Sequence, residues 1–182
     1  MRSAFAVIFG MFVSMLIVMM GLDIYVMCQN VNIENKADTK FAYMYTYKYP
    51  TEEVPDGGEE AFGKTLKKER LGYNLDVTLL GIHDDNPYFD AKVEDGKNKI
   101  VISTAVAQKY NVGEGDVFVL NDEETDTKYA FDIVGIAQYS SSLYIFMDID
   151  SMRELFHEGS DYYNIVFSDK DLSIPSGRLY AT

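Results

Sequence analysis

KIVISTAVAQKYNVGEGDVFVL, residues 99–120, predicts a strand, a short helix, a tight turn and a second strand in immediate succession. Its first four residues have the apolar character of a buried strand, and Ser103 or Thr104 can cap a helix over TAVAQKY. Asn111 and Gly113 end that helix, because both residue types accept the left-handed backbone of a helix C-terminus. The GEGD turn then leads into the strand DVFVL. Short elements with short connections indicate an α+β domain with a compact, β-rich core.

The same alternation continues downstream. Gly135 interrupts an alternating strand, which predicts a bulge or a close backbone approach. Ser151 and Glu154 have the spacing of a capping box and so predict a helix start, and Gly159 marks the end of that helix. The strands predicted in this part of the chain cover residues 129–137, 143–148 and 162–168.

The clearest strand pattern lies upstream, in TKFAYMYTYKY at residues 39–49. Alternate residues fall on one face of a strand, so the aromatic side chains form a ladder on that face. One interpretation is a binding face for an apolar or sugar-like ligand. The other, which we favour, is a sheet face packed under helices, with tyrosine hydroxyls reaching water at the rim. The candidate ligand or partner surface consists of Tyr43, Tyr45, Tyr47 and Tyr49.

Three further segments follow this strand. Pro50 ends it, and TEEVPDGGEE at residues 51–60 predicts an acidic loop with Pro and Gly turns. Residues 61–70 are rich in lysine and leucine and predict a short helix or an irregular exposed segment. LDVTLLGI at residues 75–82 is typical of a buried strand.

Four potential metal ligands lie close together in HDDNPYFD, namely His83, Asp84, Asp85 and Asp90. A catalytic metal usually needs a further ligand from elsewhere, and His157 is the only other histidine of the sequence. Asp-Asp-Asn-Pro is ordinary turn chemistry, and the graded ligand spacing of a calcium loop is missing. We therefore predict a turn here, with no metal site and no cofactor.

The N-terminal run AFAVIFGMFVSMLIVMMGL, residues 4–22, contains 19 residues without a charge. As a helix it would span roughly 28 Å, close to the hydrocarbon thickness of a bilayer. Its one polar side chain, Ser14, can bond to a backbone carbonyl of the same helix. Arg2 precedes the run and Asp23 follows it, so the positive-inside tendency places the N-terminus in the cytoplasm. The predicted segments are a cytoplasmic end at residues 1–3, a transmembrane helix at 4–22 and a juxtamembrane helical extension at 23–38.

Three other kinds of N-terminal segment fit less well. A cleavable signal peptide, the main alternative, would have a shorter apolar core and a small-residue cleavage site. A lipoprotein would have small residues before its cysteine, whereas Met27 precedes Cys28. A type IV pilin would carry a glutamate early in its apolar helix. We therefore expect one retained span in a bacterial cell membrane, with everything after residue 22 outside, extracellular or periplasmic.

Composition narrows the function classes. The chain has 182 residues and a formal net charge of −13. Because Arg2 is the sole charged residue before Asp23, the remaining chain carries −14. Such a surface repels nucleic acid, whose binding depends on lysine and arginine at the phosphates. Cys28 is alone, so no disulfide can form within the chain.

No catalytic motif is present in the sequence. Nucleophilic catalysis needs a base held by a partner, and neither His83 nor His157 lies in such an arrangement. There is no P-loop, dinucleotide, zinc or G-x-S-x-G signature. We predict that the chain is not an enzyme, and that any ATP hydrolysis is carried out by another chain.

The order of elements over residues 99–168 resembles the extracytoplasmic domain of FtsX-like ABC transporter permeases, which include the MacB-type periplasmic core and related Gram-positive permeases. Each motif of this resemblance is unspecific by itself. The order of the motifs, downstream of an inward-positive helix, is specific. The residues that carry it are Ile102, Ser103, Ala107, Gly115, Asp116, Val117, Phe131, Ile133, Gly135, Ile136, Met152 and Leu155.

The resemblance implies a non-catalytic permease component whose external domain is coupled to a separate cytoplasmic ATPase. It also implies a mixed α/β external domain, with residues 39–95 as its first part and 96–182 as a β-rich subdomain. By the same resemblance, the helical extension passes movement outward, and the external domain handles lipids, lipoproteins, peptides or antibiotics or regulates a partner. The expected partners are the lipid bilayer, the ATPase and a second copy of the chain, which would form a homodimer.

Permeases of this family have four or more membrane helices, whereas one apolar run is found here. We therefore expect either a piece of a permease or a single-pass relative. The alternative function is a single-pass, membrane-anchored extracellular binding or signalling module. Its acidic surface and tyrosines would suit a cationic peptide or a glycan.

Overall fold

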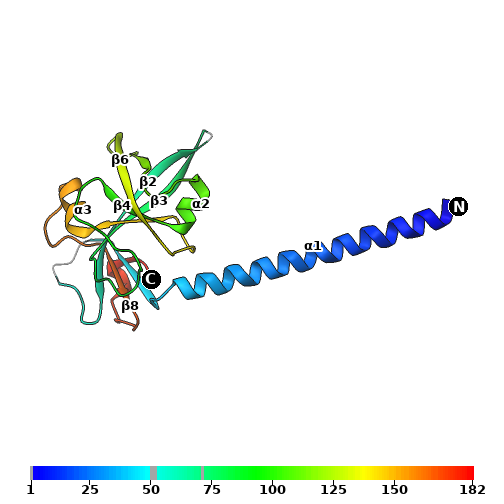
Figure 1. Ribbon diagram of the computed structural model, residues 1–182. Coiled ribbons are helices and arrows are strands. Elements are labelled where there is room, and N and C mark those ends of the chain that lie inside the picture. The colour runs from blue at the N-terminus through cyan, green and yellow to red at the C-terminus, as the bar shows by residue number, and fades with distance from the viewer. Residues whose placement is uncertain (1, 50–52, 71) are drawn as a thin grey trace. The chain divides into compact units, whose positions relative to one another are not determined.

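The computed structural model describes residues 2–49, 53–70 and 72–182 (Figure 1). The chain divides into two compact units, Met1–Ala37 and Asp38–Thr182. The first unit contains most of the helix α1, Arg2–Asp38, and the second contains all strands and the remaining helices. Each unit is described by itself below.

Helix α1 carries no charged residue over positions 4–22. Within the described residues it is the one helix long and apolar enough to cross a membrane, over Val7–Asn30. The side chains of this span are exposed, and Ser14 Oγ donates a hydrogen bond to the Gly10 carbonyl at 2.8 Å, as predicted. The helix continues without a break through residues 23–38. It therefore fits a single membrane span.

The second unit is built around a closed ring of strands. Among the described residues, six strands pair in the order β3-β7-β4-β6-β5-β2, and β2 pairs with β3 again. The β3–β7 and β4–β6 pairs are parallel, and the β4–β7, β5–β6, β2–β5 and β2–β3 pairs are antiparallel. Each of the six strands therefore has a strand on both sides, although β2 and β5 are joined by the single pair of Lys67 with Asn121. Their bounds are β2 Glu59–Arg70, β3 Tyr73–Ile82, β4 Lys99–Ser103, β5 Val117–Asp122, β6 Thr127–Ala137 and β7 Tyr144–Asp148.

A second, smaller sheet starts from the same strand β2. Residues Glu59, Glu60 and Ala61 pair with β8, Ile165–Ser168, while the later part of β2 lies in the ring. Beyond β8 the order continues to β1, Tyr43–Tyr47, and then to β9, Leu179–Ala181. A short 3-10 helix, Ser176–Arg178, precedes β9. Strands from residues 39–95 and from residues 96–182 are therefore paired in both sheets.

Two short helices cover the ring. Helix α2, Thr104–Tyr110, begins and ends as predicted: Ser103 Oγ accepts a hydrogen bond from the Val106 amide at 3.3 Å, and Asn111 has a φ of 53°. Helix α3, Ile149–Phe156, begins earlier than predicted. Its cap is Asp148, whose carboxylate accepts from the Ser151 amide at 2.8 Å. The proposed cap at Ser151 is therefore wrong, because the aspartate that ends β7 reaches that amide itself.

The helix or irregular segment predicted for residues 61–70 is wrong, since these residues form most of β2. They pair with β3 in an unbroken register from Phe62 opposite Gly81 to Arg70 opposite Tyr73. Lysine and leucine favour helices in isolation, but pairing along the segment with the next strand, β3, and at single residues with β5 and β8, overrides that preference. The acidic loop predicted for residues 51–60 lies partly outside the described residues, and β2 already begins at Glu59.

The bulge predicted at Gly135 is confirmed. Residues Ile100 and Val101 of β4 are adjacent, but their partners on β6 are Ile133 and Gly135, so Val134 is the extra residue. The strand predicted for residues 39–49 is also confirmed, although its ladder is limited to Tyr43–Tyr47. The other predicted strands all lie in the ring or the second sheet.

Three apolar clusters form the core. The first fills the ring and includes Leu66, Phe118 and Ile145. The second joins the outside of the ring to the second sheet through Phe146 and Phe167. Because β3, β4 and β7 contribute to both clusters, they are buried on both faces, which explains their continuous apolar sequences. The third cluster lies on the second sheet, with Tyr45, Tyr47, Tyr163, Val166 and Leu179.

The close approach of α3 to β3 depends on Gly81. A Cβ at this position would lie 2.9 Å from Met152 Sδ and 3.2 Å from the Ile149 Cα. We expect Gly81→Ala to lower the free energy of unfolding by about 1–3 kcal/mol, because overpacking shifts the helix backbone. The measurement is urea unfolding of the detergent-solubilised chain, followed by circular dichroism.

Gly113→Ala is the matched control, since nothing lies within 4 Å of a Cβ there. It should change the free energy of unfolding by about 0.5 kcal/mol or less. Equal effects of the two substitutions would contradict the role of Gly81 in helix packing.

Candidate functional site

The four tyrosines predicted as a surface have different environments. Tyr45 and Tyr47 are 2% and 4% exposed and belong to the core of the second sheet. The Tyr45 hydroxyl donates to Asp171 Oδ1 at 3.1 Å and accepts from the Leu172 amide at 2.9 Å. Tyr43 and Tyr49 retain exposed side chains. The ladder thus serves mainly as packing, and a ligand role for the two exposed rings stays a prediction.

The residues considered as metal ligands are arranged as a turn. The Asn86 amide donates to the His83 carbonyl at 3.1 Å, and Asp84, Asp85 and Asp90 are exposed. Within residues 2–49, 53–70 and 72–182, no three His, Cys, Asp or Glu side chains are close enough to hold a metal ion.

His83 instead takes part in a network centred on a buried arginine. Arg153 on α3 is 5% exposed, and its guanidinium lies 3.0 Å from Glu60 Oε1 and 3.0 Å from Asp150 Oδ1. Its Nε donates to the Tyr162 carbonyl at 2.8 Å, and His83 Nε2 lies 3.0 Å from the same Glu60 oxygen. The network ties β2 to α3 at the point where β2 passes from one sheet to the other.

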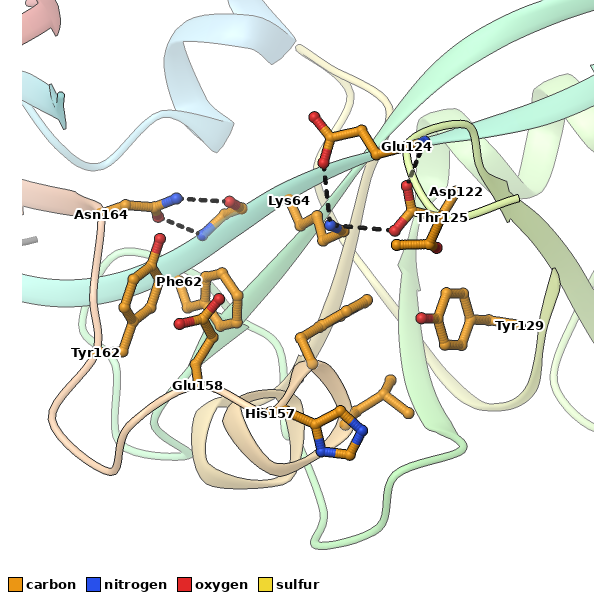
Figure 2. A pocket seen from close by; sticks show the side chains of 13 residues that line it. Phe62, Lys64, Asp122, Glu124, Thr125, Tyr129, His157, Glu158, Tyr162 and Asn164 are labelled. Carbon is orange, nitrogen blue, oxygen red and sulfur yellow. Dashed lines mark hydrogen bonds and ion pairs between the residues drawn. The ribbon is translucent and has the colours of Figure 1, made fainter. Parts of the chain in front are cut away.

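A pocket of about 390 Å³ lies next to this network, between β2, β6 and the end of α3 (Figure 2). We call it the Lys64 pocket. The sequence did not indicate it, because its lining comes from three separate stretches of the chain and residues 61–70 were expected to be helical or irregular. It is lined by Phe62, Gly63, Lys64, Asp122, Glu124, Thr125, Tyr129, Leu155, Phe156, His157, Glu158, Tyr162 and Asn164.

Lys64 is held by two carboxylates. Its Nζ lies 3.1 Å from Asp122 Oδ2 and 3.6 Å from Glu124 Oε2, as the dashed lines of Figure 2 mark. Burial would raise the pKa of Asp122, but hydrogen bonds from Lys64 and the Glu124 amide outweigh it and bring the pKa below its ordinary value. Burial would likewise lower the pKa of Lys64, and the bond to Asp122 raises it. Both groups are therefore charged at neutral pH.

One side of the pocket is aromatic. Four rings contact one another in the order Tyr162, Phe62, Phe156 and Tyr129, with centroid distances of 4.9, 6.0 and 5.3 Å. Lys64 Nζ lies 5.1 Å from the centre of the Phe156 ring. The Asn164 side-chain amide, also part of the lining, pairs with both backbone groups of Gly63, the residue before Lys64, at 2.7 and 2.8 Å. The pocket therefore combines negative charge with aromatic faces.

Comparison with known proteins gives similarities only among solved structures. The chain matches no protein family, and no curated protein matches its sequence. It is similar to the extracellular domain of the noncanonic ABC-type transporter YknZ from Gram-positive bacteria, with 16% identity and a TM-score of 0.44, over 64% of this chain and 67% of that chain. It is also similar to the periplasmic region of MacB from Actinobacillus actinomycetemcomitans, with 13% identity and a TM-score of 0.43, over 79% of this chain and 66% of that chain. Both structures are external regions of the kinds of transporter that the sequence analysis named.

The Lys64–Asp122 pair gives a prediction for stability. Asp122 is 2% exposed, so Lys64→Met would leave a buried carboxylate without a cation. We expect the free energy of unfolding at neutral pH to fall by about 2 kcal/mol, less than for a fully buried pair because Lys64 is partly exposed. Lys92→Met, at an exposed position, should have little effect.

The loss should also depend on pH. In the native protein the pKa of Asp122 is below 3.8, so its stabilising effect is present above pH 3.8 and disappears as the pH falls through the lower, folded-state value. The difference in stability between the native protein and Lys64→Met should therefore shrink in acid. Urea unfolding at a series of pH values measures it, and a constant difference would show that the charge of Asp122 is not involved.

Proposed function

We propose that this chain is the first membrane helix and external domain of an FtsX-like ABC transporter permease component. The observation that carries the proposal is the order of the family's sequence motifs along one ring. Ile102 and Ser103 end β4, Gly115 and Asp116 precede β5, and Gly135 bulges β6. Motifs that are weak one by one thus all belong to a single structural unit that follows a membrane-length helix.

The proposed topology has residues 1–3 in the cytoplasm, 4–22 in the bilayer and 23–38 as a helical extension outside it. The chain carries no P-loop, so ATP would be hydrolysed by a separate cytoplasmic subunit. A helix without a break can pass movement along its axis, because its backbone hydrogen bonds resist bending. In this proposal the chain is non-catalytic and transmits the ATPase cycle to its external domain.

The start of the external domain is firmly bonded, which supports transmission. The Asp38 carboxylate accepts hydrogen bonds from both the amide and the hydroxyl of Ser140, at 2.8 and 2.6 Å. Two charge-assisted bonds at the residue where the chain enters the domain would pull on the β6–β7 connection.

A second candidate function is a single-pass binding module without an ATPase. The Lys64 pocket favours it, since a pocket with charge and aromatic faces is typical of ligand recognition. In this case the helix would be only an anchor. The homodimer named among the expected partners would then consist of two copies of this module.

Purification separates the two functions. If the permease proposal holds, the chain isolated from its native membrane in mild detergent should carry an ATPase subunit and vanadate-sensitive ATP hydrolysis. A variant that begins at Asp23 lacks the apolar run and is the control, because it shows whether the ATPase subunit associates without the membrane helix. Isolation without an ATPase subunit, together with retained ligand binding, would favour the binding module.

Continuity of the helix can be tested in the same complex. Inserting a flexible Gly-Ser stretch after Asn30 should leave ATP hydrolysis in place but abolish the transport or resistance that depends on it. The same insertion after Gly72, an exposed residue between β2 and β3, is the control and should preserve both. Unchanged transport with the insertion after Asn30 would contradict rigid transmission.

A further inference from the structure

We propose that the Lys64 pocket binds an organic cation, namely an alkylammonium or guanidinium group carried by a basic peptide or a polyamine. The proposal concerns the pocket alone and goes beyond the permease function. It does not depend on an ATPase partner or on the direction in which the chain crosses the membrane.

The charge of the lining is the first argument. Three carboxylates, Asp122, Glu124 and Glu158, face one ammonium group, that of Lys64. Asp122 is matched by Lys64 at 3.1 Å, whereas the Glu124 side chain is 85% exposed and lies 3.6 Å from the same nitrogen. Glu158 lines the other side, next to His157 (Figure 2). Two carboxylates thus remain in excess, and they are the accessible ones.

The surroundings of Lys64 show which interactions stabilise a cation in the pocket. Its ammonium group lies between two carboxylates and 5.1 Å from the Phe156 ring centre, and its pKa is raised despite partial burial. A positive charge over the face of a ring is attracted by the ring's electron density. The surroundings that hold this internal cation extend along the aromatic side toward Glu158, where no lysine or arginine belongs to the lining.

The aromatic side provides the apolar contact. Tyr162 and Tyr129 lie at the two ends of the row of rings, on either side of Lys64 in Figure 2. Both are partly exposed, so a ligand can reach them. The methylene groups of a lysine, an arginine or a polyamine fit such a surface while the charged end meets a carboxylate. An anionic ligand would be repelled by the same carboxylates, and the charge of −14 outside the apolar helix adds to that repulsion.

The test is calorimetric titration of the full chain in a nonionic detergent. The probes are spermidine and a tri-lysine peptide with blocked ends, and the peptide with acetylated lysines is the neutral control. Salt of about 0.15 M screens attraction to distant carboxylates. We expect both cationic probes to bind and the acetylated peptide not to bind, and the tighter probe identifies the source of the cation.

Substitutions locate the site. Glu124→Gln together with Glu158→Gln should weaken binding about tenfold, since two charge contacts are removed. Phe156→Leu should weaken it about threefold through loss of the ring face. Glu114→Gln removes an exposed carboxylate that does not belong to the lining and should leave binding unchanged.

Three results would overturn the proposal. They are the absence of binding by both cationic probes, equal weakening by Glu114→Gln and the double variant, and unchanged binding in the double variant. Circular dichroism of each variant confirms that it is folded. None of these results bears on the presence of an ATPase, so the outcome is independent of the permease proposal.

Discussion

Backbone pairing along β2 is the constraint on which the external domain depends. Over twelve residues this strand closes the ring against β3 and β5, and with its first residues it starts the second sheet against β8. Its side chains continue the same division. Leu66 points into the ring, Ala61 belongs to the cluster between the sheets, and Glu60 holds the buried Arg153. A break in β2 would therefore both open the ring and detach the second sheet from it.

The site follows from the same strand. Phe62 and Lys64 project from β2 beside α3 and β6, and Asn164 binds the backbone of Gly63 between them. Where β2 leaves the second sheet it has no strand partner on this side, and the Asn164 side chain takes that place. The gap that remains is the Lys64 pocket. A feature of sheet topology thus creates the cavity, and the charges at its rim decide which ligands it accepts.

Strong acidity shapes the domain in two ways. Most carboxylates are exposed and need no partner, which keeps the surface negative. Two that are buried or half-buried, Asp122 and Glu60, lie against Lys64 and Arg153 respectively. Breaking such a pair would leave a buried charge without a partner, which lowers the stability of the domain. The excess negative charge is therefore found where ligands can reach it.

The sequence by itself determined the local features of this protein. The apolar helix, the strand and helix order of residues 99–168, the caps at Ser103 and Asn111 and the bulge at Gly135 depend on neighbouring residues, so pattern and turn chemistry predicted them. Only the tertiary structure decided the rest. Residues 61–70 became a strand that pairs along its length with β3 and, at Lys67 and Ala61, with β5 and β8 far along the chain. Tyr45 and Tyr47 were buried by the second sheet, and the Lys64 pocket arose where three separate stretches of the chain meet. Such contacts have no signature in a single sequence, because their energy comes from residues that are neighbours in space alone.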